Sequence, residues 1–275
     1  MQPVEVIRGD GPIVLGVPHA GTFVPDDIRV RLNKTGLQLA DTDWHVDRLY
    51  EGLLSSATMV KAGFHRYVID ANRDPTGVSL YPGQNTTSLC PTTDFDGRPI
   101  YDKGQEPDAA EIEARRLAWH APYHAALEAE INRVKALHGV AILFDCHSIR
   151  SVVPFLFDGR LPDFNTGTNN GSTCAQAVEA AVVSHTETAE GYTSVLNGRF
   201  KGGWTTRYYG HPGDGVHAIQ MELAQRTHLA SEDLPFAFDE EKADRLRGPL
   251  KRILSALENV APTLNKKSEI PGSEQ

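Results

Sequence analysis

Short apolar runs bounded by turn residues recur along the chain and predict the strands of a sheet. In order they are PIVLGV (12–17), ATMVKAG (57–63), RYVIDA (66–71), VAILFD (140–145), SVLNGRF (194–200) and HAIQMEL (217–223). Runs of this length that end in Gly, Asp, Asn or Pro are typical of strands buried inside a fold.

Between these runs, apolar positions recur at three- and four-residue spacing, which predicts helices. The longest such stretch covers residues 108–138 and contains Pro122, which we expect to kink or break the helix. Further helices are predicted at 173–186 and 239–260. Strands that alternate with helices indicate an α/β fold, in which helices pack on the faces of a sheet.

The chain has 275 residues, and no stretch between residues 1 and 260 has the composition of a linker. This length suits one large core, so we predict a single domain over residues 1–262. The polar segment TLNKKSEIPGSEQ at 263–275 shows no periodicity and is expected to be a loose tail.

Composition narrows the possible partners. The chain carries 36 acidic and 27 basic residues, a formal charge of −9, without a Lys/Arg run, which argues against nucleic acid and favours a small-molecule partner. It has neither a long apolar stretch nor a secretory leader, so we expect no membrane span and a cytoplasmic location. Its 3 cysteines show no CxxC spacing, so any metal must be held by histidines and carboxylates.

Polar residues lie at the ends of three of the predicted strands. In open α/β sheets, ligands bind outside the carboxyl ends of the strands, so these positions are candidates for a site. The first strand leads into His19 within VLGVPHAGT. In VAILFDCHSIR, the two-residue strand period places Asp145 and His147 on one face and Cys146, a predicted core residue, on the other.

The third strand end lies within AIQMELAQ. The same period places Gln220 and Glu222 on one face, while the opposite face carries core residues, namely Ile219, Met221 and Leu223.

A hydrolytic zinc site commonly uses two histidines, a carboxylate and an open position for water. His19 and His147 are the candidate histidines. The candidate carboxylates lie in DTDWHVDRLY (41–50), where Asp43 and Asp47 share a face if the segment is helical. We prefer Asp47, with Asp43 as the alternative. In the competing interpretation, Asp41 or Asp43 only caps the helix and Asp47 is solvated.

Two histidines and a glycine-rich stretch were also considered. His120 and His124 have the spacing of metal ligands, but Pro122 lies between them, so packing or support of the site is favoured. The stretch NGRFKGGWTTRYYG (197–210) lacks the spacing of a phosphate-binding loop. We interpret it as a flexible, cationic substrate loop that carries Arg199, Lys201 and Arg207.

Asn72 and Arg73 follow the run at 66–71. A guanidinium beside an amide is well suited to bind a carboxylate through two parallel hydrogen bonds. The alternative is a surface ion pair between Arg73 and Asp70 or Asp74.

Taken together, several of these segments resemble the N-formylglutamate amidohydrolase family over roughly residues 12–230. They are VPHAGT, DTDWHVDRLY, FHRYVIDANRDP, LYPGQNTT, DCHSIRS, NGRFKGGWTTRYYG and QMELAQ. The resemblance implies a catalytic domain with a mixed central sheet and helices on both faces, similar to zinc carboxypeptidases and aspartoacylases. It also implies metal-dependent hydrolysis of N-formyl-L-glutamate to formate and L-glutamate, the last step of one histidine-degradation route.

The resemblance assigns roles to several residues. His147 matches the second zinc histidine, Glu222 the catalytic glutamate, and Asn72 with Arg73 a carboxylate-binding pair. The zinc carboxypeptidases have a glutamate ligand three residues after the first histidine, where this chain has Thr22. The carboxylate ligand is therefore sought in Asp47, or in Asp43, and the expected metal is zinc.

N-formylglutamate has two carboxylates, which need separate cations. We assign the α-carboxylate to Arg73 with Asn72. Arg207 is preferred for the side-chain carboxylate, with Arg199 and Lys201 as alternatives. The rival function is an acylamino-acid hydrolase or a carboxypeptidase-like zinc peptidase, which needs a larger pocket. Neither the native metal nor the oligomeric state follows from the residue pattern.

Overall fold

The computed structural model describes residues 2–78, 80 and 85–264 of the chain. Within the predicted tail at 263–275, the first two residues complete the last helix and the rest lie outside the described residues. Part of the LYPGQNTT segment also lies outside them.

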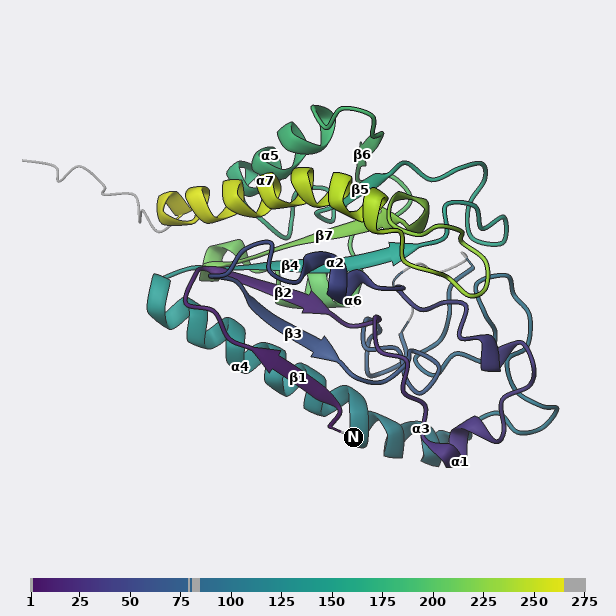
Figure 1. Cartoon of the computed structure of the whole chain (residues 1–275). Helices are drawn as coiled ribbons and strands as arrows, with labels where there is room; N and C mark the ends of the chain where they lie inside the picture. The colour runs from purple at the N-terminus through teal and green to yellow at the C-terminus, as the bar shows by residue number, and fades with distance from the viewer. Residues whose placement is uncertain (1, 79, 81–84, 265–275) are drawn as a thin grey trace, which may run out of the picture.

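A mixed, seven-stranded sheet forms the centre of the described part of the chain (Figure 1). Across the sheet the strands are β1 (Val4–Ile7), β3 (Thr58–Ala62), β2 (Ile13–Val17), β4 (Ala141–Ile149), β7 (Val216–Ala224), β5 (Phe164–Gly167) and β6 (Ser194–Leu196). The central strands β3, β2, β4 and β7 are parallel, whereas β1 and β5 run antiparallel to their neighbours β3 and β7. The predicted α/β class is thereby confirmed.

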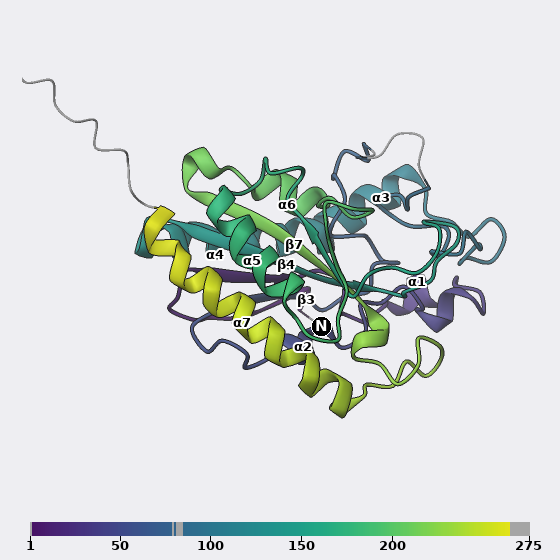
Figure 2. The ribbon, with the colours of Figure 1, turned by 90° about the horizontal axis from the view of Figure 1, so that it is seen from above.

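Helices cover both faces of this sheet (Figures 1 and 2). One layer contains α2 (Val46–Tyr50), α5 (Gln176–Glu187) and α7 (Glu240–Leu264), and the other contains α4 (Ala121–His138) and α6 (Trp204–Tyr209). The remaining elements are α1 (Asp26–Arg29), α3 (Ala109–Arg115) and 3₁₀ turns at Gly36–Gln38, Pro212–Asp214 and Gln225–Thr227.

The two longest strands show how the sequence pattern becomes two cores. Every residue of β4 and β7 is buried. Along β4, Phe144 and Cys146 pack in the core beneath α7, while Leu143 packs in the core beneath α4. Cys146 is therefore a core residue, as predicted. The alternation continues past the apolar part of each strand and places Asp145 and His147 on the α4 side.

The predicted strand at 66–71 is wrong. This segment is buried but irregular, and its backbone carbonyls bind side chains instead of a neighbouring strand. Arg115 donates to the carbonyls of Tyr67 and Val68, and His124 Nε2 lies 2.7 Å from the carbonyl of Ala71. Because these side chains satisfy the backbone, an apolar segment is stable here without joining the sheet.

Other boundaries also differ from the prediction. The strands β1 and β5 were not predicted, and the predicted strand at 194–200 is shorter, because β6 ends at Leu196. Near Pro122 the helix does not break; instead a π-helical turn at Arg116–His120 joins α3 to α4. Such a turn accommodates a residue that cannot donate a backbone hydrogen bond.

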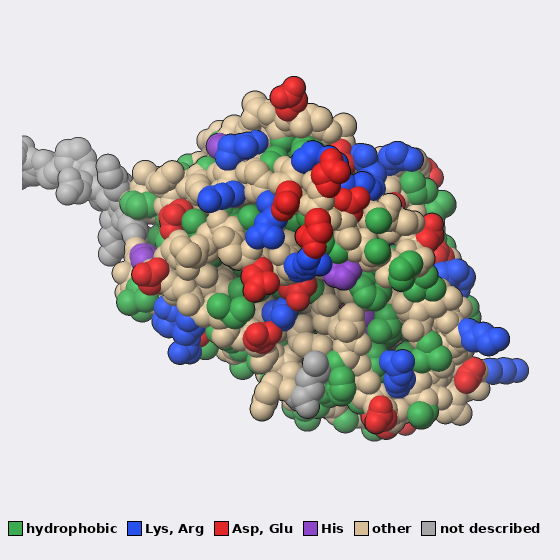
Figure 3. Space-filling model, in the orientation of Figure 1, with side chains coloured by type: hydrophobic (Ala, Val, Ile, Leu, Met, Phe, Trp, Pro, Cys, Tyr) green, Lys and Arg blue, Asp and Glu red, His purple; other side chains and the backbone are tan. Residues whose placement is uncertain are grey.

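Acidic and basic side chains are interspersed on the face shown in Figure 3, in agreement with a chain that has no Lys/Arg run. No helix in the described ranges combines the length and apolar character needed to cross a membrane.

Candidate active site

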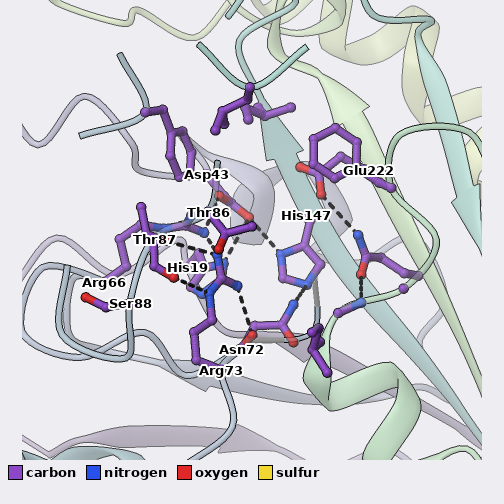
Figure 4. Close-up of a pocket in the computed structure, with 18 of the residues that line it drawn as sticks. His19, Asp43, Arg66, Asn72, Arg73, Thr86, Thr87, Ser88, His147 and Glu222 are labelled. Carbon is purple, nitrogen blue, oxygen red and sulfur yellow. Dashed lines mark hydrogen bonds and ion pairs between the residues drawn. The ribbon is translucent and has the colours of Figure 1, made fainter. Parts of the chain in front are cut away.

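A cavity of about 320 Å³ lies at the carboxyl ends of the central strands (Figure 4). Its lining includes residues from three regions: His19 after β2, His147 on β4 and Glu222 on β7. Figure 4 shows His147, Asn72 and Glu222 on one side of the cavity, and Arg66, Arg73 and Thr87 on the other. The structure thus brings the three strand ends found in the sequence into one site.

His19, Asp43 and His147 form a compact, buried cluster whose candidate ligand atoms all lie within 4.8 Å of one another. Asp43 Oδ2 lies 3.7 Å from His19 Nδ1 and 3.1 Å from His147 Nδ1. Ligands held tetrahedrally at about 2.0–2.1 Å from zinc lie roughly 3.4 Å apart. The spacing of the cluster therefore fits a single zinc-like ion.

Asp47, preferred from the sequence as the carboxylate ligand, lies away from this cluster. Its carboxylate accepts a hydrogen bond from Lys61 at 3.2 Å and is partly exposed. Asp43 and Asp47 do not share a helix, because α2 begins only at Val46 and His45 before it has a positive φ of 61°. Instead, the Asp43 N–H donates to the His19 carbonyl at 3.0 Å, which holds Asp43 at the strand end.

A buried carboxylate lies behind each histidine of the cluster. His19 Nε2 is 2.7 Å from Asp70 Oδ1, and His147 Nε2 is 3.1 Å from Asp145 Oδ1. Thr206, on α6, in turn donates to Asp145 Oδ2 at 2.9 Å. Histidines that bind metals are commonly oriented in this way, with the second ring nitrogen donating to a carboxylate.

The charges around the cluster also fit a divalent cation. Four carboxylates (Asp43, Asp70, Asp145 and Glu222) are buried there, against two arginines (Arg66 and Arg73). Even with Glu222 protonated, the three aspartates outnumber the two arginines, so these surroundings favour a bound cation.

The pKa values of the cluster show the effect of these charges. Burial alone raises the pKa of Asp43, but Arg66 and the two histidines hold it well below its usual range. Burial lowers the pKa of His147, yet Asp145 and Asp43 raise it well above its usual value. Asp43 is therefore ionised and ready to act as a ligand.

Glu222 lies on β7 directly opposite His147 on β4. Burial raises its pKa to about 8, and this outweighs the lowering effect of His147. Gln220, on the same face of β7, donates from Nε2 to Glu222 Oε2 at 3.1 Å. A carboxylate with a pKa near neutrality in a cavity is a candidate general base.

Arg66 is a site residue that the sequence analysis missed. It is buried, its Nη2 lies 3.2 Å from Asp43 Oδ1, and it also contacts His19 Nδ1. It was overlooked because RYVIDA was interpreted as a regular strand. A signal was present, however, since a strand buried on both faces has no place for an arginine without a carboxylate partner.

Asn72 and Arg73 both line the cavity, as their predicted role requires. Arg73 donates from Nε to the Thr87 carbonyl, from Nη2 to Thr87 Oγ1 and from Nη1 to the Asn72 carbonyl, at 2.9–3.0 Å. Counting only these bonds, each terminal nitrogen keeps one N–H group, and two such groups are what a bidentate carboxylate needs. Arg73 also lies 3.7 Å from Asp70, the partner named in the alternative interpretation.

The flexible loop predicted at 197–210 is in part a helix, because α6 covers Trp204–Tyr209. Its three cations are in different places. Among the described residues, Arg199 lines the cavity, whereas Lys201 and Arg207 do not. Arg207 Nε donates to the Gly202 carbonyl at 2.9 Å, so it holds the loop in place. Arg199 Nε donates to the Leu156 carbonyl at 2.9 Å, beside the cavity.

His120 and His124 lie outside the cluster of candidate metal ligands. His120 Nε2 is 3.1 Å from the Arg73 carbonyl, and His124 Nε2 is 2.7 Å from the Ala71 carbonyl. They thus support the backbone of the segment that carries Asn72 and Arg73, in agreement with the favoured interpretation.

Comparison with known proteins identifies relatives of this chain. A sequence profile described as N-formylglutamate amidohydrolase matches residues 11–229. The N-formylglutamate deformylase of Pseudomonas aeruginosa is 46% identical over 253 residues, which cover 91% of this chain and 94% of that protein. The N-formylglutamate deformylase of Pseudomonas putida is 42% identical over 251 residues, covering 91% of this chain and 93% of the relative.

Solved structures show the same fold. The N-formylglutamate amidohydrolase from Ralstonia eutropha JMP134 superposes with a TM-score of 0.76 at 25% identity, covering 96% of this chain and 98% of the other. A protein from Agrobacterium tumefaciens superposes with a TM-score of 0.71 at 22% identity, covering 94% and 96%.

Proposed function

Because this chain belongs to the N-formylglutamate amidohydrolase family, we propose that it hydrolyses the formamide C–N bond of N-formyl-L-glutamate. The products are formate and L-glutamate. The observation that carries the proposal is the meeting of Glu222 with the His19–Asp43–His147 cluster in a cavity that also presents Arg73 and Arg199. Hydrolysis of a small amide with two carboxylates requires a base, a set of metal ligands and two cations that bind the carboxylates.

The two carboxylates of the substrate are assigned to different parts of the cavity. Arg73 and Asn72 bind the α-carboxylate, because Thr87 orients Arg73 and its bonds to Thr87 and Asn72 leave one N–H group on each terminal nitrogen. Arg199 binds the side-chain carboxylate, because it is the loop cation that lines the cavity. This changes the order of preference from Arg207 to Arg199.

The proposed metal ligands are His19, Asp43 and His147. A divalent cation held there, zinc being the expected one, would supply Lewis acidity for the formyl oxygen and would make a nearby water more acidic. Asp70 and Asp145 keep the two imidazole rings oriented toward that position. Arg66 adds a fixed positive charge that stabilises negative charge developing on the formyl oxygen.

Glu222 transfers the proton. It accepts a proton from the water that attacks the formyl carbon, and it passes that proton to the nitrogen as the C–N bond breaks. The amine of glutamate therefore leaves as a neutral group. A pKa of about 8 allows the same carboxyl group to accept and to release a proton near neutral pH.

The proposal is tested by turnover with the zinc-reconstituted enzyme. N-formylglutamate should be hydrolysed with a higher kcat/KM than N-formylglutamine, N-formylleucine or N-acetylglutamate. A preference for N-acetylglutamate or for peptides would favour the acylamino-acid hydrolase or peptidase instead. Full activity after verified removal of all divalent metal would contradict the metal-dependent mechanism.

Three further expectations belong to this proposal. One catalytic domain spans residues 1–262, the reaction closes one route of histidine degradation, and it takes place in the cytoplasm. Both Pseudomonas relatives are named for the deformylase reaction, which supports the proposed reaction itself.

A further inference from the structure

We propose that Gln220 is a positioning residue that holds the carboxylate of Glu222 in the orientation needed for proton transfer, and that Gly203 in the substrate loop fixes Gln220. The inference rests on the proposed role of Glu222 as general base. Gln220 acts through Glu222, and its bond to Gly203 links the base to the loop that carries Arg199.

The orientation of the Gln220 amide follows from its partners. The side chain is buried, and its Oε1 accepts a hydrogen bond from the Gly203 backbone N–H at 2.7 Å. A backbone N–H can only donate, so the oxygen of the amide must face Gly203. The amide nitrogen is then directed at Glu222 and donates to Oε2 at 3.1 Å.

Glu222 needs such a contact because the last torsion of a glutamate side chain is soft. A carboxylate held through Oε2 presents Oε1 in a reproducible direction. Register reinforces the arrangement: Gln220 is opposite Asp145, and Glu222 is opposite His147, across the same pair of strands. The strand pair thus fixes both side chains on one face. The hydrogen bond from the Gln220 amide then restricts the rotation of the Glu222 carboxylate.

Gly203 is itself held closely. A Cβ at this position would lie 2.3 Å from Asn72 Nδ2, so a larger residue cannot occupy it without displacing Asn72. The preceding residue, Gly202, has a φ of +109°, which favours glycine. The position of the Gly203 N–H therefore depends on the path of the substrate loop. Through Gln220, that path also orients the carboxylate of Glu222.

The first test is Gln220→Leu, which keeps approximate size and removes both hydrogen bonds. On the N-formyl amino acid that the wild type turns over best, kcat should fall roughly 10- to 100-fold, the worth of one hydrogen bond to a charged group. KM should change less than about three-fold, because the proposed contacts of Arg73, Asn72 and Arg199 with the substrate are left intact. Gln220→Met, with a flexible unbranched side chain, replaces this variant if the leucine variant does not fold. Wild-type kcat in a folded variant would overturn the inference.

A double-mutant cycle separates positioning from a general structural effect. If Gln220 acts through Glu222, then adding Gln220→Leu to Glu222→Gln should lower kcat by less than about two-fold, because the shared step is already lost. If the two losses multiply, Gln220 does not act through Glu222.

Asn165 provides the matched control. It is a buried amide that donates to the backbone carbonyl of Glu222 at 3.0 Å, not to its carboxylate. Asn165→Leu should lower the free energy of unfolding while kcat stays within about two-fold of wild type. An equal loss of kcat in this variant would show that any disturbance of β7 lowers kcat to the same extent. That result would overturn the specific role of Gln220. Wild-type turnover of the substrate panel tests the proposed function separately.

Discussion

His147 and Glu222 are directly opposite each other across the parallel pair β4 and β7. Both strands are buried along their whole length, so the backbone of neither residue depends on a loop for its position. The proposed metal ligand and the proposed base therefore project from two central, buried strands, on the face covered by α4 and α6. This relationship is the basis for the predictions on catalysis below.

Asp43→Asn should strip the metal, whereas Asp47→Asn should not. Asp43 lies within 3.1 and 3.7 Å of the imidazole nitrogens, while Asp47 pairs with Lys61 at the surface. Metal content after dialysis, measured by mass spectrometry, distinguishes the two. Metal loss from the Asp47 variant with retention by the Asp43 variant would restore Asp47 as the ligand.

Asp70→Asn should weaken metal binding by roughly 10- to 100-fold, the usual effect of removing a carboxylate that orients a ligand histidine. The variant keeps an oxygen near His19 Nε2 but loses the charge. Competition with a zinc chelator gives the affinity. The control is Asp163→Asn: Asp163 is also buried, but it pairs with Arg226 and neither residue lines the cavity. An equal loss of affinity in both variants would argue against a specific role for Asp70.

Glu222→Gln should lower kcat by roughly 10²- to 10⁴-fold, the usual contribution of general acid–base catalysis. The amide keeps the size of the side chain but cannot accept the proton. The fold, metal content and affinity for N-formylglutamate, measured by calorimetry, should stay near those of the wild type. Turnover within a few-fold of wild type would remove Glu222 from the base role.

Arg199→Ala should reduce the preference for N-formylglutamate over N-formylglutamine. Loss of one charge-assisted contact costs about 1.5–3 kcal/mol, which corresponds to roughly 10- to 150-fold in kcat/KM. Lys201→Ala removes a nearby charge of the same sign from outside the cavity lining and is the matched control. An unchanged preference in the Arg199 variant, or a larger loss in the Lys201 variant, would reassign the second carboxylate.

The metal-free protein should become less stable as the pH falls from about 6.5 toward 3, and His124 should contribute to this loss. Burial lowers the pKa of His124 from 6.5 to about 3. In this range the unfolded chain binds a proton at His124 that the folded chain does not, which costs up to about 1.4 kcal/mol per pH unit. His124→Asn should lower the slope of unfolding free energy against pH by about that amount, measured by urea unfolding at pH 4–6. An unchanged slope would mean that the folded protein already protonates His124.

Local sequence specifies the strands whose side chains alternate regularly between the two faces of the sheet. The apolar runs gave β2, β4 and β7, and the period of two placed His147 and Glu222 on the cavity side with Cys146 in the core. It also marked His19, because a polar residue directly after a buried strand stands at the sheet edge where ligands bind. In each case the direction of the side chain is set by the local backbone, which local sequence specifies.

Which charged groups meet in the site depends on how distant segments fold together. Arg66 and Asp70 reach the cluster because the segment at 66–71 leaves the sheet, and side chains distant in sequence, Arg115 and His124, satisfy its backbone. Asp43 reaches His19 because its own N–H binds the His19 carbonyl and the helix starts later than the acidic pattern suggests. Arg199 lines the cavity from the segment after β6, whereas Arg207 lies on α6, outside the lining. The physical reason is that contacts between irregular segments depend on the path of the backbone through the whole fold, and no local period of the sequence encodes that path.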